Sequence, residues 1–207
     1  MMPRPCNFGF FLALSCVLFL ACEREPIEQF CPNVGVGELA ISEIRGVTDA
    51  AGQWFELHNP NDTAVNLTGL SLRLAKLDGA GEWEIVLREQ GLSLEPFGYF
   101  VLGRFNSDDL PSHVDYGYAA DFDGDIYSAG FLQLYACETL IDQVIWGQDD
   151  NSASAEILPS DGTLSFDGAV VLTAESNDIG ANWCYDEMDD GFYKSGTPKE
   201  MNRACEP

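Results

Sequence analysis

The sequence predicts an all-β domain built as a β-sandwich, and three observations support this prediction. Short segments alternate apolar and polar residues with a period of two, which is typical of half-buried strands. Turn-forming Gly, Pro, Asn and Asp residues recur roughly every ten residues between these segments. Beyond residue 21, no apolar stripe has the 3.6-residue period of a helix. About seven or eight short strands of this kind are typical of a two-sheet sandwich.

The predicted strands share branched and aromatic apolar residues at alternate positions. They cover residues 39–44, 53–58, 70–74, 83–87, 99–102, 131–135 and 141–146, with a further edge strand expected at 168–172. In the second of these strands, the alternation places Trp54 and Glu56 on the face opposite Phe55. We expect Glu56 to accept hydrogen bonds from backbone amides at the start of a loop, and Asn59 to cap the turn that follows.

The first 21 residues have the pattern of an export signal. Arg4 is the only charged residue among them, and residues 8–21 form an uncharged apolar run. This run suits the centre of a signal peptide and is shorter than the ~20 residues that a membrane-spanning helix needs. It ends in LFLAC (residues 18–22), which resembles a bacterial lipobox, with Phe19 where an aliphatic residue is typical.

The lipobox resemblance implies cleavage before Cys22 and attachment of lipid to its thiol. Two or three acyl chains anchor a protein stably where one chain does not. We therefore expect residues 1–21 to be a signal peptide and residues 22–36 to contain the lipidated cysteine and a short tether. The protein is expected to be exported and lipid-anchored to a bacterial membrane, at the periplasmic face of the outer membrane or at the cell surface. The alternative is an ordinary secretory signal peptide followed by an incidental cysteine.

The cysteine count agrees with export to an oxidising compartment. Of the seven cysteines, Cys6 and Cys16 lie in the signal peptide and Cys22 would receive lipid. Four cysteines then remain: Cys31, Cys137, Cys184 and Cys205. An even number predicts two disulfides, with three pairings open. We favour Cys184–Cys205 together with Cys31–Cys137, because the first pair closes a short local loop.

The charge is strongly negative. The chain has 10 Lys and Arg against 34 Asp and Glu, and loss of Arg4 with the signal peptide would leave a net charge of −25. Such a surface repels nucleic acid phosphates and anionic lipid headgroups. We therefore expect no nucleic-acid partner.

One acidic segment suggests a cation site. Asp121, Asp123 and Asp125 alternate along a loop, which could direct three carboxylates toward a hard cation such as Ca²⁺. The segment departs from a calcium-binding EF-hand loop, because Ile126 stands at the glycine position and Leu132 at the final glutamate position. The alternative is an acidic hairpin loop. We expect no other cofactor.

The sequence carries no enzyme signature that we can assign. It has no Gly-x-Ser-x-Gly and no His-Glu-x-x-His, and its two histidines, His58 and His113, are expected at the surface. Four tryptophans are expected in the core rather than on a sugar-binding face: Trp54, Trp83, Trp146 and Trp183. Four acidic residues of the tail are expected to form a solvated loop: Asp186, Glu187, Asp189 and Asp190.

Several motifs occur in an order that is informative together. They are LAISEI (39–44), GQWFELHNPNDTAVNLTGLSL (52–72), LEPFGYFVLGR (94–104), GFLQLY (130–135) and IDQVIWG (141–147). In this order they resemble the lamin tail domain family. The SGTPKEMNRAC segment (195–205) is similar to the Gly-Thr-Pro-Gly-x-x-Asn ending of bacterial members, with Lys199 in place of the second glycine.

The lamin-tail resemblance implies an immunoglobulin-like β-sandwich and no catalytic site. We expect the sandwich to span residues 37–150, with residues 151–207 as an irregular extension of the same domain pinned by disulfides. Bacterial members of the family occur in exported and membrane-associated proteins, and a tethering role has been proposed for some.

These observations favour a non-enzymatic, lipid-anchored cell-envelope protein that serves as a binding, tethering or structural module. Its expected partners are the membrane, through lipid on Cys22, and an unidentified envelope protein or polysaccharide. The first alternative is a Ca²⁺-assisted adhesin or carbohydrate-binding domain. The second is a hydrolase that uses paired carboxylates.

Overall fold

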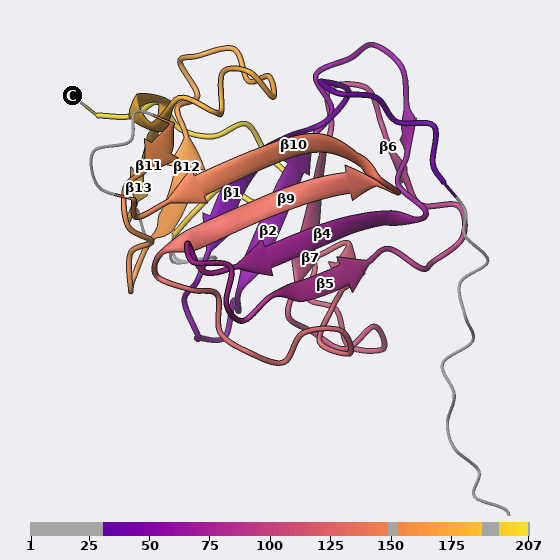
Figure 1. Ribbon diagram of the computed structural model, residues 1–207, viewed down its shortest axis with the longest axis horizontal. Helices are drawn as coiled ribbons and strands as arrows, with labels where there is room; N and C mark the ends of the chain where they lie inside the picture. Colours follow the sequence, from indigo (N-terminus) through magenta and orange to yellow (C-terminus); the bar gives the residue numbers. More distant parts are fainter. Residues whose placement is uncertain (1–30, 149–152, 188–194, 207) are drawn as a thin grey trace, which may run out of the picture.

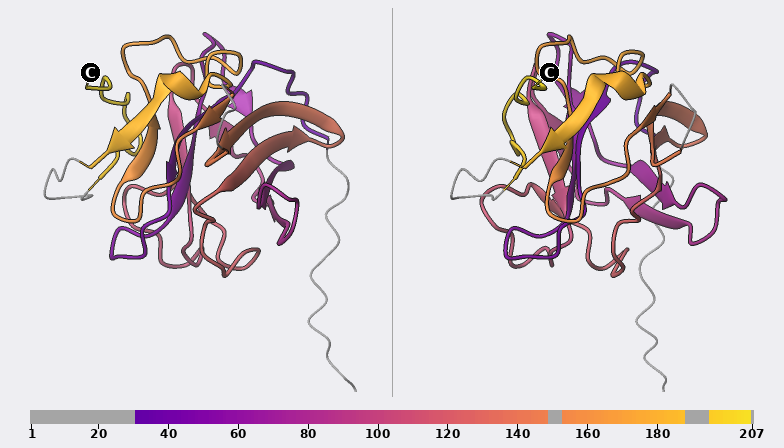
Figure 2. Two further views of the ribbon diagram at one scale, coloured as in Figure 1. Left: turned by 60° about the vertical axis from the view of Figure 1, so that its left-hand side comes forward. Right: turned by 90° about the vertical axis from the view of Figure 1, so that its left-hand side faces the viewer.

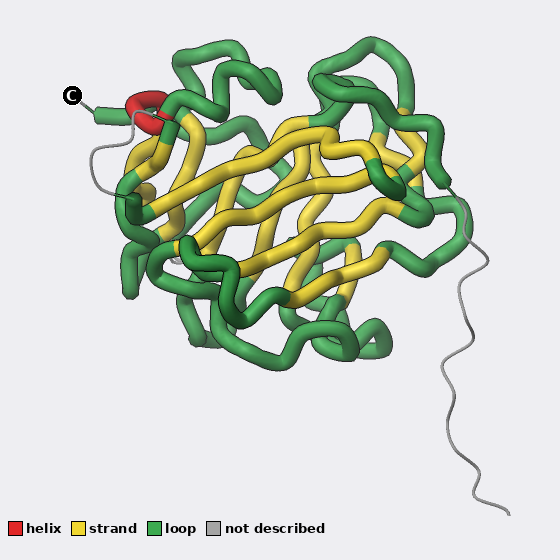
Figure 3. Tube along the Cα trace, in the orientation of Figure 1, coloured by secondary structure: helices red, strands yellow, loops and turns green. Residues whose placement is uncertain are grey.

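The computed structural model describes residues 31–148, 153–187 and 195–206, and in them the chain folds as two facing β-sheets. Figure 1 shows the smaller sheet in front of the larger one, and Figure 3 shows that loops and one short helical turn make up the rest. The all-β class and the sandwich-like arrangement are therefore confirmed. The described residues contain no helix that could span a membrane.

The larger sheet has six strands in the order β13-β12-β1-β2-β7-β8. In this order the strands are Trp183–Asp186, Thr163–Phe166, Ala40–Arg45, Trp54–His58, Tyr99–Gly103 and Tyr116–Gly117. All neighbours are antiparallel except β7 and β8, which are parallel. Strand β1 has a bulge between Ile41 and Glu43, where its register with β2 shifts.

The smaller sheet has five strands in the order β11-β10-β9-β4-β5. In this order they are Ser154–Ala155, Thr139–Trp146, Gly130–Ala136, Leu70–Ala75 and Trp83–Val86. A separate pair is formed by β3 (Val65–Asn66) and β6 (Ser93–Leu94), and a short 3₁₀ helix η1 (Gly180–Asn182) precedes β13.

The main core lies between the two sheets. Leu39, Ile41 and Ile44 around β1 pack with Phe55 and Leu57 of β2 and with the inward residues of β4, β9 and β10. The strict alternation of burial along β9 shows why a period-two pattern identified this strand, since its outward residues are only half buried.

The six-stranded sheet is buried on its outer face as well. A second apolar cluster of Trp54, Val101 and Val114 lies there, and all six residues of β1 are buried. Figure 2 shows the C-terminal segment, in yellow, running along the side of this sheet that faces away from the smaller sheet. The molecule therefore has two sheets and a third, irregular layer that covers the larger one.

Most of the predicted strands are confirmed, and the C-terminal part of the chain requires corrections. Strands β12 and β13 belong to the six-stranded sheet, so residues 151–207 are not uniformly irregular. The edge strand expected at 168–172 does not form. A turn closed by a 2.9 Å hydrogen bond from Val170 N to Asp167 O takes the chain out of the sheet. A Cβ on Gly168 would lie 1.9 Å from Asn202 O, so the C-terminal segment passes directly against this turn.

Candidate functional site

The four cysteines that remain after Cys22 form two disulfides in the described structure. Cys31 pairs with Cys137 and Cys184 with Cys205, the pairing that we favoured from the sequence. Cys137 lies in the turn between β9 and β10, so the first disulfide fastens the start of the described chain to that hairpin. Cys22 itself lies outside the described residues.

Two of the three aspartates of the hypothetical cation site are engaged by separate arginines. Asp121 Oδ2 accepts hydrogen bonds from the Arg88 guanidinium and from Val86 N, whereas Asp125 pairs with Arg104 at 2.7 Å. Among the described residues, no three His, Cys, Asp or Glu side chains lie together in a way that could hold a metal ion. The structure therefore does not support the hypothesis that Asp121, Asp123 and Asp125 form a Ca²⁺ site, because the three carboxylates do not converge and two of them are paired with different arginines.

Both histidines are held by backbone carbonyl groups. His113 is buried beside Trp54, with 5.3 Å between the ring centroids, and its Nε2 lies 2.9 Å from Ala51 O. His58 stacks on Tyr99, and its Nδ1 lies 3.0 Å from Gly98 O. Burial lowers the pKa of both imidazoles. The expectation that His113 lies at the surface is wrong, because the loop after β7 folds over the outer face of the sheet.

Three tryptophans are buried as expected and one is not. Trp54, Trp146 and Trp183 are buried, whereas Trp83 is 42% exposed on the edge strand β5 and rests on Phe122. An edge strand of four residues has a neighbour on one side only, so it covers a large ring incompletely.

Two buried glutamates receive the C-terminal segment. Glu43 of β1 and Glu56 of β2 stand directly opposite each other in the register, on the outer face of the sheet, and both are fully buried. Glu43 accepts from Thr197 N at 2.9 Å and from the Thr197 hydroxyl at 2.7 Å. Glu56 accepts from Lys199 N at 2.6 Å and from the Ser42 hydroxyl at 2.7 Å.

This arrangement defines what the two carboxylates can do. Burial raises the pKa of both, and the facing Glu43 raises the pKa of Glu56 further. Their oxygen atoms accept hydrogen bonds from Thr197 and Lys199 of the C-terminal segment and from the Ser42 and Ser165 hydroxyls of the sheet, so they hold that segment on the sheet. Glu56 bonds a backbone amide, as expected, but that amide is 143 residues away in the sequence and not in the adjacent loop.

Arg45 completes this polar layer beneath residues 195–199. Its guanidinium donates two hydrogen bonds to Asp49, reaches Val47 O, Gly52 O and Ser195 Oγ, and stacks over the Trp54 ring. A fully buried guanidinium needs this many acceptors, because each unsatisfied donor would cost free energy. The layer is therefore a structural fastening of the C-terminal segment.

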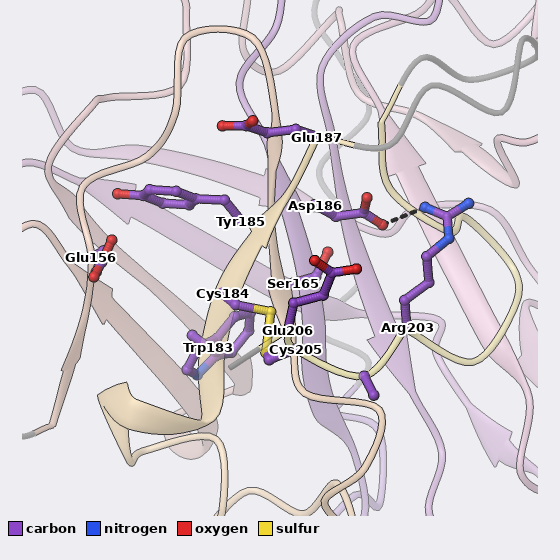
Figure 4. Close-up of a pocket in the computed structure, with 11 residues that line it drawn as sticks. Glu156, Ser165, Trp183, Cys184, Tyr185, Asp186, Glu187, Arg203, Cys205 and Glu206 are labelled. Carbon is purple, nitrogen blue, oxygen red and sulfur yellow. Dashed lines mark hydrogen bonds and ion pairs between the residues drawn. A yellow bond between two sulfur atoms is a disulfide. The ribbon is translucent and has the colours of Figure 1, made fainter.

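A cleft of about 530 Å³ lies along the edge strand β13 and is a candidate binding surface. Its walls come from β13, from Glu156 and from residues 203–206. Figure 4 shows the Cys184–Cys205 disulfide between these walls, with the Tyr185 and Glu156 side chains on one side and Arg203 on the other.

Electrostatics gives the cleft an acidic character. Arg203 is paired with the buried Asp186, whereas Glu156, Glu187 and Glu206 line the remaining surface. We expected Asp186 in a solvated loop, but its side chain is buried in strand β13. Asp189 and Asp190 lie outside the described residues. Burial, followed by the nearby Glu156, raises the pKa of Tyr185 to about 12, and its hydroxyl donates to Ile157 O at 2.7 Å. The cleft suits basic or hydroxylated groups of a partner.

Comparisons with known proteins do not assign this chain to a family. A scan against protein-family models and a search of curated proteins found no match to this chain.

Sequence reasoning missed the polar layer of Glu43, Arg45 and Glu56. Charged residues at alternate positions of a strand normally indicate a solvated face, whereas here the C-terminal segment covers that face. The only signal was the charge of these residues on strands that are otherwise strongly apolar.

Proposed function

We propose that this protein is a non-enzymatic, lipid-anchored module of the bacterial cell envelope that binds or tethers a partner. The lipobox at residues 18–22 and the lamin-tail-like order of motifs support this proposal from the sequence. We further propose that the sandwich is of the immunoglobulin-like, lamin-tail type, with strands that follow the motifs in the expected order.

The observation that carries the proposal is the Cys31–Cys137 disulfide. It fastens the chain to the β9–β10 hairpin only nine residues after Cys22. A short link of this kind holds a folded unit close to its anchor, since an extended residue spans at most about 3.6 Å.

The position of the acidic cleft fits a module that presents a surface away from its attachment point. In Figure 1 the strand β13 lies at the left-hand edge, and the chain enters at the right-hand edge beside the β9–β10 hairpin. A basic envelope protein or a hydroxylated polysaccharide would complement the carboxylates of the cleft.

The anchor is tested by fractionation of cells that produce the full chain with Cys22→Ala. We expect the wild-type protein in the membrane fraction and the variant in the soluble exported fraction. Cys16→Ala is the matched control, because it changes a cysteine of the signal peptide without touching the lipobox, and it should leave the protein membrane-bound. Membrane retention of Cys22→Ala at wild-type level would refute the anchor.

The binding surface is tested by placing a photo-crosslinking residue at Glu187, on the rim of the cleft, in intact cells. The same residue at Glu84, which is exposed on β5 at the far edge of the other sheet, is the control. We expect a discrete crosslinked product from position 187 only. Equal products from both positions, or none from position 187, would contradict a partner at the cleft.

A further inference from the structure

One end of the six-stranded sheet carries an unusual concentration of exposed apolar side chains. Strand β1 begins there, β2 ends there at His58 and β7 begins there at Tyr99, because Ala40 pairs with His58 and His58 with Tyr99. A groove of about 240 Å³ opens at this end and is lined by His58, Tyr99, Met201 and residues 168–172. We refer to this region as the apolar end.

The exposure values single out this end among the described residues. The large apolar side chains that are exposed are Val171 (81%), Val36 (72%), Met201 (69%), Phe97 (62%), Ile157 (55%), Ile179 (49%), Trp83 (42%) and Leu77 (41%). Val171 and Met201 line the groove. Phe97 precedes Gly98, whose carbonyl contacts His58. The four most exposed side chains include these three, so the pattern is not a random scatter over the surface.

Val36 belongs to the same end through a chain of hydrogen bonds. The Asn61 amide donates to Glu38 O at 3.0 Å, and Asn61 O accepts from Phe97 N at 3.2 Å. The turn that carries Val36 therefore lies against the loop that carries Phe97. Figure 1 shows β6, which immediately precedes the Phe97 loop, on the side of the molecule where the described chain begins.

Phe97 occupies a backbone conformation that an aromatic residue rarely adopts. Its φ is 55°, in the left-handed region, within a turn closed by a hydrogen bond from Gly98 N to Glu95 O. Glycine or asparagine would adopt this conformation at lower cost. An exposed phenylalanine here gains nothing from packing in the core, so its presence at this position points to a contact outside the chain.

The distance to the anchor identifies what covers this end. Cys31 follows Cys22 by nine positions, so the anchor cannot lie more than roughly 30 Å from the start of the folded unit. The turn of Val36 follows Cys31 by only five residues. A bilayer that holds lipid on Cys22 is therefore the apolar surface nearest to this end.

We propose that the apolar end rests on the bilayer beside the lipid anchor, with Phe97 and Val171 at the boundary between headgroups and acyl chains. This inference rests on the proposed anchor at Cys22. Exposed carboxylates at Glu38, Asp62 and Glu95 adjoin the apolar tips, so the contact requires zwitterionic headgroups and is weakened by anionic lipid.

Hydrogen exchange on the full lipidated chain tests the proposal. The protein is reconstituted into vesicles of phosphatidylethanolamine and phosphatidylcholine and compared with the Cys22→Ser protein free in solution. We expect amides of residues 95–98 and 168–172 to exchange at least about fivefold more slowly on vesicles, and those around Leu77 to be unchanged. Inclusion of phosphatidylglycerol should reduce the protection.

Paired variants provide the control. Phe97→Asn combined with Val171→Ser removes the apolar tips, and asparagine tolerates the left-handed conformation, so folding should be preserved. Leu77→Ser combined with Ile157→Ser removes exposed apolar residues elsewhere. Protection of residues 168–172 should be lost in the first pair and kept in the second.

The outcomes separate this inference from the proposed function. Full-chain protein that does not associate with membranes overturns both. Protein that is anchored through Cys22 but shows no protection at the apolar end overturns the inference alone. Protection that appears without vesicles and grows with protein concentration also overturns it, because the covering surface would then be a second copy of the chain.

Discussion

Two pairs of buried polar residues decide how this chain closes on itself. Glu43 and Glu56 face each other on neighbouring strands, where two like charges would repel, and they are tolerated because each accepts hydrogen bonds from the C-terminal segment. Asp142 of β10 accepts from Ile41 N of β1 at 2.6 Å and from the Asn177 amide at 2.8 Å, and so links the two sheets. The bulge of β1 lies next to Ile41, whose N–H donates to that carboxylate.

Removal of the Glu56 carboxyl should destabilise the fold markedly. Glu56→Ala leaves the Ser42 hydroxyl and the Lys199 amide without their acceptor and should lower the free energy of unfolding by about 3 kcal/mol. Glu56→Gln, which resembles the protonated carboxyl, should cost about 1 kcal/mol or less. Urea denaturation measures both. Glu84→Ala, an exposed glutamate on β5, is the control, and a Glu56→Ala effect as small as that of Glu84→Ala would contradict this role.

Asp142 should make stability depend on pH. Burial raises its pKa to about 7, so the folded state holds a proton that the unfolded state releases near pH 4. The stabilisation is present at low pH and is lost as the pH rises toward 7, by at most about 1.4 kcal/mol per pH unit. Relative to the wild type, Asp142→Asn should therefore gain stability between pH 5 and pH 7, as measured by denaturation at each pH. A constant difference between the two proteins would refute the raised pKa.

At the scale of elements, the C-terminal segment is the part of the fold whose place depends most on distant residues. Two glutamates, Asn202 and a disulfide hold it on the outer face of the six-stranded sheet, and the Asn202 amide donates to Ser42 O and Phe166 O at 2.9 Å. These contacts join residues up to 160 positions apart, so the place of the segment depends on strands that lie far from it in the sequence.

The Cys184–Cys205 disulfide should restrain this segment specifically. Its loop spans 21 residues, and loss of such a crosslink costs about 3 kcal/mol in chain entropy of the unfolded state. In the Cys184→Ser/Cys205→Ser protein, we expect faster hydrogen exchange at Thr197, Lys199 and Asn202. The Cys31→Ser/Cys137→Ser protein is the comparison, and it should loosen residues 31–38 instead. Identical exchange profiles for the two proteins would contradict separate roles for the two disulfides.

The strands that sequence reasoning recovered are those with a clear period of two. Strand β9 alternates in burial, and β10 largely does, because one face meets the core and the other is more open. In β4 the sequence alternates in polarity, although Arg73 is the only residue of the strand that is not buried. Strand β12 was not predicted because it has only four residues, 163–166. The strand was predicted instead at the more apolar stretch 168–172. That stretch leaves the sheet since the backbone at Gly168 touches Asn202, a contact that no local pattern reveals.

The candidate site was predictable only in part, for the same reason. Cysteine counting anticipated the disulfide that borders the cleft, but the ion pair between Asp186 and Arg203 joins residues 17 positions apart across an edge strand that was not predicted. Patterns in a single sequence predict which faces of strands are apolar. They do not predict which surfaces a later segment of the chain will cover.

At the scale of the whole molecule, the features separate spatially. The disulfide at Cys31 lies on the side where the chain enters, and the acidic cleft lies at the opposite edge, along β13. The apolar end extends between them, because the lining of its groove includes Phe166 and Asn202, which directly adjoin Ser165 and Arg203 of the cleft. The strong negative charge of the chain would keep the rest of the surface solvated and away from anionic lipids. Under the proposed function, the anchor would lie on the first side and a partner would bind at the second.

The mass of the N-terminal peptide of the mature protein, isolated from its native membrane, tests this account most directly. We predict that the peptide begins at Cys22 and carries the added mass of a diacylglyceryl group on the thiol, with or without a further acyl group on the new amino terminus. A mature protein that begins at another residue, or that begins at an unmodified Cys22, would contradict the lipid anchor and with it the proposed role in the envelope.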